Sequence, residues 1–267
     1  MSRIDDCFTR LRASGEGALV CFVTAGDPNI DTTEDIVLEL GQAGADIVEL
    51  GIPFSDPIAD GPSIQAASMR ALEAGTNVTK VLDLVRSIRD KSDLPIVLMT
   101  YCNPVLRYGL RRFASEAVAA GADGVIVTDL VSEEAQEWKA VADASGLSTI
   151  FLLAPTSTEQ RIAEVSKLAS GFIYCVSRTG VTGARQEMAQ GVRDLVARIR
   201  SKTDKPVVVG FGISSREHVQ EVCEYADGAV VGSLLVDLIA EKAYSEALLP
   251  ELKEAVSELK SGTRLQQ

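Results

Sequence analysis

The stretch Ala43-Gly44-Ala45-Asp46-Ile47-Val48-Glu49-Leu50-Gly51 contains the repeating unit that decides the fold. A glycine that is typical of a helix end is followed by an aspartate and then by a short apolar strand. The junction recurs as Ala120-Gly121-Ala122-Asp123, and Ala226-Asp227-Gly228 resembles it. Repetition of one strand–helix unit along the chain is the simplest explanation of this similarity.

Eight apolar runs alternate with segments of helical periodicity. We predict strands at 18–24, 46–51, 95–101, 123–128, 148–153, 171–176, 206–211 and 227–232. Their apolar residues are continuous rather than alternating, as is typical of strands buried on both faces. Units spaced about 25 to 45 residues apart predict an α/β fold, a (β/α)₈ TIM barrel, and a doubly wound open sheet is the alternative.

The helical segments complete this prediction. An extra N-terminal helix at 4–11 should cover the barrel floor, two helices should fill 63–93, and a short helix at 234–240 should follow the eighth strand. The last helix is expected at 245–260, before a polar tail. Pairs typical of helix starts are Asp31/Glu34, Thr156/Glu159 and Ser214/Glu217, and glycines typical of helix ends are Gly41 or Gly44, Gly75, Gly121, Gly146 and Gly171. No composition break divides the chain, so we expect a single barrel domain over residues 1–267.

Composition excludes several classes of function. The 267 residues are 46% hydrophobic and carry a formal net charge of −12, without the basic footprint of a nucleic-acid-binding protein. No apolar run is long enough for a membrane helix, and the N-terminus lacks the apolar core of a secretion signal. We therefore expect no nucleic acid and no membrane as partners, and a cytoplasmic location.

The scarcity of certain residue types narrows the chemistry. The five cysteines are scattered without a C-x-x-C motif, which indicates reduced thiols, and Cys21 and Cys175 fall in apolar strands as core residues. The one histidine, His218, cannot form a multi-histidine metal site and is interpreted as an ordinary helix residue. None of the nine lysines falls at the C-terminal end of a predicted strand, where an imine-forming aldolase would need one.

Two acids stand where a barrel places its active site. Glu49 comes near the end of the second strand, and Asp60 lies eleven residues further on, in a loop that contains Pro53, Pro57 and Pro62. Proline fixes φ, so such a loop is restricted to few conformations. Catalytic groups of barrels lie at the C-terminal ends of strands, and two carboxylates facing each other there suit acid–base chemistry. The alternative for each acid alone is a solvated surface carboxylate.

Glycine-rich turns after the last strands predict a phosphate site. Gly210-Phe211-Gly212 follows the seventh strand, and Gly232-Ser233 follows the eighth and opens the short helix. Barrels often bind phosphate with backbone N–H groups of these two loops and of the extra helix. The segment Ser177–Arg185 after the sixth strand is interpreted as a lid, with Gly180 as a flexible point and Gly183 as a third phosphate donor. A disordered surface loop is the alternative.

Apolar side chains near the strand ends predict a flat pocket. Its expected members are Phe22, Ile64, Met99, Tyr101, Ile126, Tyr174 and Phe211. An ordinary barrel core is the alternative, above all for Ile64, Met99 and Ile126.

With these segments identified, the sequence resembles the tryptophan synthase α chain family over almost its whole length. The resemblance rests on Phe22–Pro28, Glu49–Pro57 with Ala59–Pro62, Tyr101–Pro104, Ser177–Gly183, Gly210–Ser214 and Gly232-Ser233. It implies a (β/α)₈ barrel that cleaves indole-3-glycerol phosphate to indole and glyceraldehyde 3-phosphate without a cofactor.

The resemblance also implies roles for single residues. The family's catalytic acids match Glu49 and Asp60. Its phosphate donors match Gly183, Phe211, Gly212, Gly232 and Ser233, and its indole pocket matches Phe22, Met99, Ile126, Tyr174 and Phe211. Arg178, Gly180 and Thr182 belong to the segment interpreted above as a lid. Asp56, Pro57 and Asn103 match positions that face the β chain.

The family works as an αββα complex in which indole passes through a channel to a pyridoxal-phosphate β chain. Pyridoxal phosphate belongs to that partner. Three other readings stay open at this point. The chain could be another phosphosugar barrel such as an isomerase, a non-catalytic regulatory subunit, or a lyase that works alone and releases free indole.

Overall fold

The computed structural model describes residues 2–176, 185–210 and 212–264. Eight parallel strands close into a barrel in the order β1-β2-β3-β4-β5-β6-β7-β8, which confirms the TIM barrel and excludes the open sheet. The strands are β1 (Ala18–Thr24), β2 (Ile47–Gly51), β3 (Ile96–Thr100), β4 (Gly124–Val127), β5 (Ser148–Leu153), β6 (Ile173–Val176), β7 (Val207–Gly210) and β8 (Gly228–Val231). Each lies within a residue or two of its predicted position.

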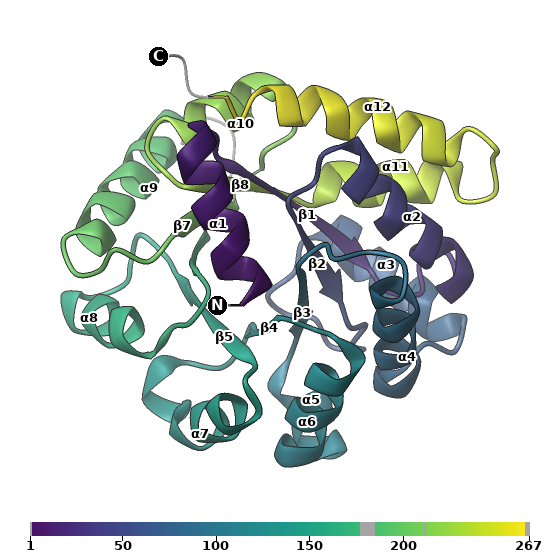
Figure 1. Ribbon diagram of the computed structural model, residues 1–267, viewed down its shortest axis with the longest axis horizontal. Helices are drawn as coiled ribbons and strands as arrows, with labels where there is room; N and C mark the ends of the chain where they lie inside the picture. The colour runs from purple at the N-terminus through teal and green to yellow at the C-terminus, as the bar shows by residue number, and fades with distance from the viewer. Residues whose placement is uncertain (1, 177–184, 211, 265–267) are drawn as a thin grey trace.

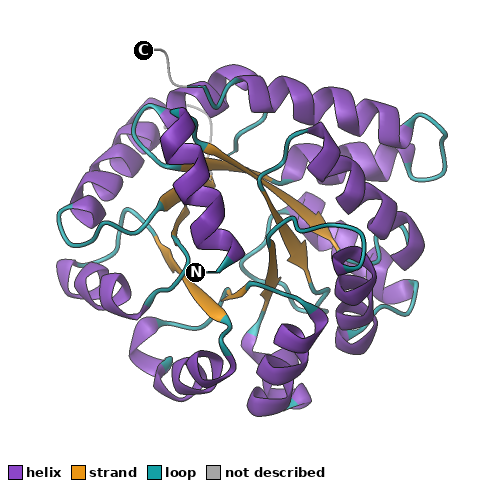
Figure 2. Cartoon of the chain, in the orientation of Figure 1, coloured by secondary structure: helices purple, strands orange, loops and turns teal. Residues whose placement is uncertain are grey.

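Apart from α1, which crosses one end of the barrel, the helices surround the strands as an outer ring (Figure 2). The helices are α1 (Arg3–Ser14), α2 (Ile30–Ala43), α3 (Pro62–Glu73), α4 (Val78–Arg89), α5 (Cys102–Tyr108), α6 (Leu110–Ala120), α7 (Gln136–Ser145), α8 (Glu159–Leu168), α9 (Arg185–Arg200), α10 (Arg216–Cys223), α11 (Ser233–Lys242) and α12 (Leu248–Ser261), with a 3₁₀ turn, η1 (Ser132–Glu134). The two helices expected in 63–93 are α3 and α4, and the short helix after the eighth strand is α11. The short helix α5 was not predicted.

Alternate residues of each strand face opposite sides of the barrel wall. In β2, Val48 and Leu50 pack outward against the helices, while Ile47 belongs to the interior. The interior cluster takes residues from all eight strands: Ala18, Val20, Ile47, Val97, Ile126, Ile150, Phe172, Tyr174, Val208 and Val230. Because successive side chains of a strand point to opposite faces, Glu49 shares the interior face with Ile47.

Helix α1 covers the N-terminal end of the barrel, as predicted, and lies across the end that faces the viewer in Figure 1. Its buried residues Ile4, Cys7, Phe8 and Leu11 belong to the interior cluster. The Cδ1 atom of Ile4 lies 3.3 Å from the place that a Cβ atom of Gly124 would take, so the glycine lets the helix approach β4 closely. The floor is therefore closed, and access to the interior is left to the opposite end.

Three predicted helix starts were wrong by one or two residues. The N-caps of α2, α8 and α10 are Asn29, Thr158 and Ser215, rather than Asp31, Thr156 and Ser214. Each observed cap has an extended backbone, and its side-chain oxygen accepts the N–H of the residue three positions on, which is the bond that fixes a helix start. The glycine ends at Gly44, Gly121 and Gly146 are confirmed as left-handed C-caps.

Candidate active site

Glu49 sits in the middle of β2 with its side chain in the barrel interior. Its register partners are Phe22 on β1 and Val97 on β3, so apolar side chains flank it on both neighbouring strands. The residue is completely buried, and neither of its carboxylate oxygens has a hydrogen-bond partner. Burial raises the pKa of this carboxyl group to about 8, because the charged form loses its hydration. The carboxyl group of Glu49 therefore keeps its proton at neutral pH.

Asp60 lies on the loop between β2 and α3. Its backbone N–H donates to the carbonyl of Pro57 at 3.1 Å, and the Gln65 side chain donates to the Asp60 carbonyl at 2.9 Å. Pro62 stands at the first position of α3, where its fixed φ suits a helix start. Burial raises the pKa of the Asp60 carboxyl to about 6, against a hydrogen bond from Tyr101 that lowers it. At neutral pH most of this group is ionised.

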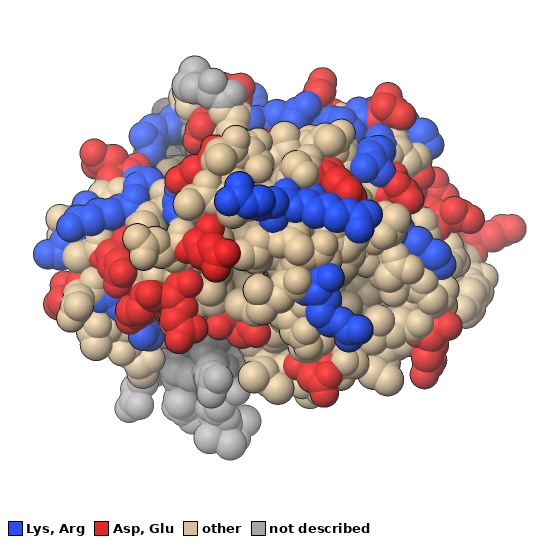
Figure 3. All heavy atoms as spheres, turned by 90° about the horizontal axis from the view of Figure 1, so that it is seen from below, with Lys and Arg blue, Asp and Glu red and all other residues tan. Residues whose placement is uncertain are grey.

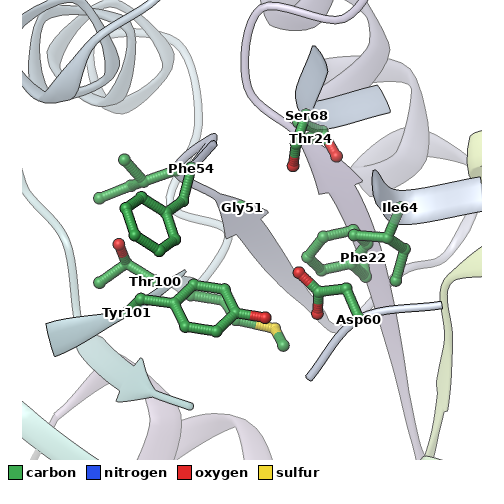
Figure 4. Close-up of a pocket in the computed structure, with 11 residues that line it drawn as sticks. Phe22, Thr24, Gly51, Phe54, Asp60, Ile64, Ser68, Thr100 and Tyr101 are labelled. Carbon is green, nitrogen blue, oxygen red and sulfur yellow. The ribbon is translucent and has the colours of Figure 1, made fainter. Parts of the chain in front are cut away.

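A pocket at the C-terminal end of the barrel brings several predicted residues together. Asp60 lines it together with Phe22, Ile64 and Met99. Figure 4 shows the Asp60 carboxylate between the Phe22 and Ile64 side chains and the Tyr101 hydroxyl. An aromatic ring and aliphatic walls next to one carboxylate suit a planar apolar group that carries a single N–H donor.

Two predicted pocket residues lie in the neighbouring interior cluster instead of on the pocket wall. Ile126 is fully buried on β4, and Tyr174 is about nine-tenths buried on β6. Burial raises the pKa of the Tyr174 phenol well above its usual value, and the negative charges of Glu49 and Asp60 raise it further.

The predicted phosphate donors are described only in part. Gly212 is exposed beyond β7 with φ +48°, a conformation that favours glycine. Gly232 is the N-cap of α11, and as a glycine it has no side chain to cap that helix start. Ser233 is the first residue of α11 and is exposed. Gly183, Phe211 and the whole predicted lid with Arg178, Gly180 and Thr182 lie outside the described residues.

The predicted partner-facing residues share one rim of the barrel. Asp56 and Pro57 belong to the β2–α3 loop, and Asn103 lies in α5. Asp56 and Asn103 are exposed and Pro57 is half-buried. Two large apolar side chains protrude beside them, Ile58 with 83% and Leu106 with 61% of its surface exposed. The rim that carries the predicted partner-facing residues therefore also exposes apolar surface.

Several pocket residues were missing from the predicted site. They are Thr24, Gly51, Ile52, Phe54, Ser68 and Thr100. Tyr101 was expected in the pocket, but its contact with Asp60 was not. The hydroxyl oxygens of Thr24 and Thr100 are buried without a hydrogen-bond partner, so they are available to a bound molecule or to water. Position at the C-terminal end of a strand would have been a signal for Thr24 and Thr100, which are the last residues of β1 and β3.

The other chemistry-bearing residues lie in helices, in the core or before strands. His218 lies half-buried in α10, and its Nδ1 is 3.4 Å from the Ser214 hydroxyl. Cys21 and Cys175 are buried core residues, and all five cysteines are free thiols. Each lysine lies in a helix or in a segment that precedes a strand. Within the described ranges, no group of three His, Cys, Asp or Glu side chains is placed to hold a metal ion.

The surface is consistent with the negative net charge. On the face drawn in Figure 3, basic side chains lie among acidic ones rather than in a continuous stripe. Over the described residues, no helix is long and apolar enough to cross a membrane.

Comparison with known proteins decides the family. The family model described as tryptophan synthase alpha chain matches residues 8–264. The chain belongs to the tryptophan synthase alpha chain family. The alpha chain of Geotalea daltonii is 53% identical over 262 residues, which cover 98% of this chain and 99% of the relative. The alpha chain of Geobacter sp. strain M21 is 54% identical over 262 residues, 98% of each chain.

Solved structures agree with this assignment. The crystal structure of tryptophan synthase subunit alpha from Legionella pneumophila superposes with a TM-score of 0.91 at 36% identity and covers 98% of both chains. A chain from tryptophan synthase of M. tuberculosis in its ligand-free form has a TM-score of 0.90 at 37% identity, over 99% of this chain and all of the other. The expected family and its barrel are thereby confirmed.

Membership of the tryptophan synthase alpha chain family establishes the reaction class. The family consists of lyases that cleave indole-3-glycerol phosphate, the step that provides indole for tryptophan synthesis. These matches favour the α chain over the isomerase, the regulatory subunit and the lyase that works alone.

Proposed function

We propose that this chain cleaves indole-3-glycerol phosphate to indole and glyceraldehyde 3-phosphate with Glu49 and Asp60 as its catalytic acids. The observation that supports this assignment most strongly is the Glu49 carboxyl, which is completely buried with both oxygens unpaired. An unsatisfied buried acid costs stability, and functional sites are where such groups concentrate. In the absence of a structural partner, a proton-transfer role explains its position.

Glu49 makes both proton transfers of the cleavage. Its protonated carboxyl gives a proton to C3 of the indole ring and so creates an indolenine cation. The resulting carboxylate then takes the proton of the C3′ hydroxyl. The O–H electrons form the aldehyde C=O bond, the bond between C3 and C3′ breaks, and its electrons restore the indole ring. Glu49 ends protonated as it began, and a raised pKa of about 8 suits this start.

Asp60 supports the same step from the ring nitrogen. As a carboxylate it accepts the indole N–H and stabilises the positive charge that the ring carries after protonation of C3. A pKa of about 6 keeps it ionised while Glu49 keeps its proton. Two carboxyl groups whose surroundings separate their pKa values are a recurrent solution to acid–base catalysis near neutral pH.

The rest of the substrate is held by the pocket and by the start of α11. Phe22, Ile64 and Met99 receive the indole ring on the pocket wall, with Ile126 and Tyr174 beneath it. Backbone N–H groups at Gly212, Gly232 and Ser233 receive the phosphate, together with Gly183 and Phe211. The uncapped N-terminus of α11 favours an anion through its dipole.

A β chain binds at the rim formed by Asp56, Pro57 and Asn103, where Ile58 and Leu106 are exposed. Matched structures described as tryptophan synthase from M. tuberculosis support such a partner. We propose an αββα tetramer, in which indole passes to the pyridoxal phosphate of the β chain. The free thiols fit work in the reducing cytoplasm.

The test is release of indole from indole-3-glycerol phosphate by the purified chain, with and without a β chain. We expect slow release that increases when the β chain is added. Fast release without a partner would instead identify an enzyme that works alone. Absence of release in both conditions would overturn the assignment of Glu49 and Asp60.

A further inference from the structure

Tyr101 lies directly after β3 and faces the loop that carries Asp60. Only 4% of its surface is exposed. Its ring packs against Phe54 of the same loop, with the ring centroids 5.2 Å apart and the planes at 34°. The residue therefore connects the third strand to the segment that follows the second.

The Tyr101 hydroxyl has two partners on neighbouring residues of that loop. It accepts the backbone N–H of Ala59 at 3.0 Å. In Figure 4 the hydroxyl also points toward the carboxylate of Asp60, and the two residues line the same pocket. A phenol can donate one hydrogen bond while it accepts another, so both contacts can exist together. Burial raises the pKa of Tyr101 to about 12, and the phenol keeps its proton throughout the neutral range.

We propose that Tyr101 is a positioning residue that orients the Asp60 carboxylate toward the pocket and keeps it ionised. This inference rests on the proposed role of Asp60. The bonds of the Asp60 backbone with Pro57 and Gln65 fix the main chain but leave the carboxylate free to rotate. The phenol fixes the carboxylate itself and so holds it where a ring N–H can reach it.

The same contact has an electrostatic consequence. Burial disfavours the charged form of Asp60, and a hydrogen bond from a neutral phenol favours it. Without the hydroxyl, burial would act alone, and more of Asp60 would be protonated at neutral pH. A protonated Asp60 loses the charge that stabilises the cationic ring.

The variant Tyr101→Phe removes the hydroxyl and keeps the ring. We expect kcat/KM to fall roughly ten- to hundredfold, the size expected for one hydrogen bond to a charged group. The fall should appear mainly in kcat, because the ring charge exists only after protonation. The acid limb of the pH–rate profile should move to higher pH. A residue that only walls the pocket would leave both unchanged, since phenylalanine fills the same space.

Tyr108→Phe is the matched control. The Tyr108 hydroxyl also bonds a carboxylate, that of Glu116, but on the outer helices α5 and α6. Its removal should leave kcat/KM and the pH profile at wild-type values. Equal losses in the two variants would mean that any lost phenol bond disturbs the barrel, and would overturn the proposal.

A second measurement does not depend on turnover. The carboxyl ¹³C resonance of Asp60, assigned by its disappearance in Asp60→Asn, is titrated in wild type and in Tyr101→Phe. We expect a higher pKa of Asp60 in the variant, and an unchanged pKa would overturn the proposal.

If Asp60→Asn itself keeps wild-type turnover, the proposed function fails. If Asp60→Asn is inactive while Tyr101→Phe is unaffected, only the role of Tyr101 fails.

Discussion

The two ends of the barrel use acidic side chains in opposite ways. At the N-terminal end, Asp46 accepts the backbone N–H of Leu19 at 2.9 Å and the ammonium of Lys260 at 2.7 Å. Three residues further along, Glu49 has no partner for either oxygen. The segment from Asp46, just before β2, to Glu49, in the middle of β2, thus carries one acid whose carboxylate is hydrogen-bonded and one whose oxygens have no partner.

The pattern at the N-terminal end is general. Asp123 accepts the N–H of Ile96 and two arginines, and Asp227 accepts the N–H of Val207 together with Arg200. In each case the aspartate joins the start of a neighbouring strand to a cation from a surrounding helix. The repeated Ala-Asp junction is therefore a structural device, while the acids toward the other end are available for chemistry.

Glu49→Gln should have the largest effect and sharpens this contrast most. We expect the rate of cleavage to fall at least about 10³-fold, because an amide cannot donate and then retake a proton. The fold should persist, since the carboxyl contributes no hydrogen bond to it. Indole release and circular dichroism on the same preparation provide the measurement. Asp46→Asn is the control at the N-terminal end of the barrel. At temperatures at which this variant is folded, its rate of cleavage should equal that of wild type. Turnover above a tenth of wild type in Glu49→Gln would remove Glu49 from its role.

Asp123→Ala tests the other end of the barrel. The change leaves Arg89, whose side chain is only 13% exposed, without its carboxylate, and the N–H of Ile96 without its acceptor. We expect a loss of about 3 kcal/mol in the free energy of unfolding, the size expected when one partner of a buried ion pair is removed. Urea unfolding measures it. Turnover at low temperature should change little, and a large loss of kcat with normal stability would break the comparison.

Much of this contrast between the two ends of the barrel could be predicted from the sequence. Buried parallel strands are continuous apolar runs, and barrel geometry sends residues near their ends, such as Glu49, toward one site. The placement of Tyr101 against Asp60 could not be predicted, because it depends on a contact between segments about forty residues apart. The hydrogen bonds that Asp46 accepts from Leu19 and Lys260 could not be predicted either, since an aspartate before a strand does not reveal its donors. Helix starts were shifted because Thr156 and Thr158, or Ser214 and Ser215, compete for the same cap.

The burial of the unpaired Glu49 carboxyl should also make the stability of the protein depend on pH. The pKa of Glu49 is about 8 in the folded chain and near 4.5 in the unfolded one. The folded state therefore binds the proton more tightly, and the contribution of Glu49 to stability is lost as pH rises from about 5 to 8. Glu49→Gln carries no such loss. The free energy of unfolding of Glu49→Gln, compared with that of wild type at the same pH, should therefore rise by about 2–4 kcal/mol as the pH increases from about 5 to 8.

Urea unfolding of both proteins at pH 5.5 and pH 8 measures this difference. If the stabilities of wild type and variant change in parallel with pH, Glu49 titrates near its ordinary pKa. The contrast between satisfied and unsatisfied acids would then lose its energetic basis.

The pH–rate profile involves the smallest free energies and tests both acids of the site together. Asp60 must be ionised and Glu49 protonated, so kcat/KM should fall below the Asp60 pKa of about 6 and above the Glu49 pKa of about 8. Each limb should approach a tenfold loss per pH unit, which corresponds to about 1.4 kcal/mol. The measurement is the initial rate of indole release from pH 5 to 9. A profile that is flat between pH 7 and 9 would show that Glu49 does not enter the reaction as the protonated acid, whatever its burial.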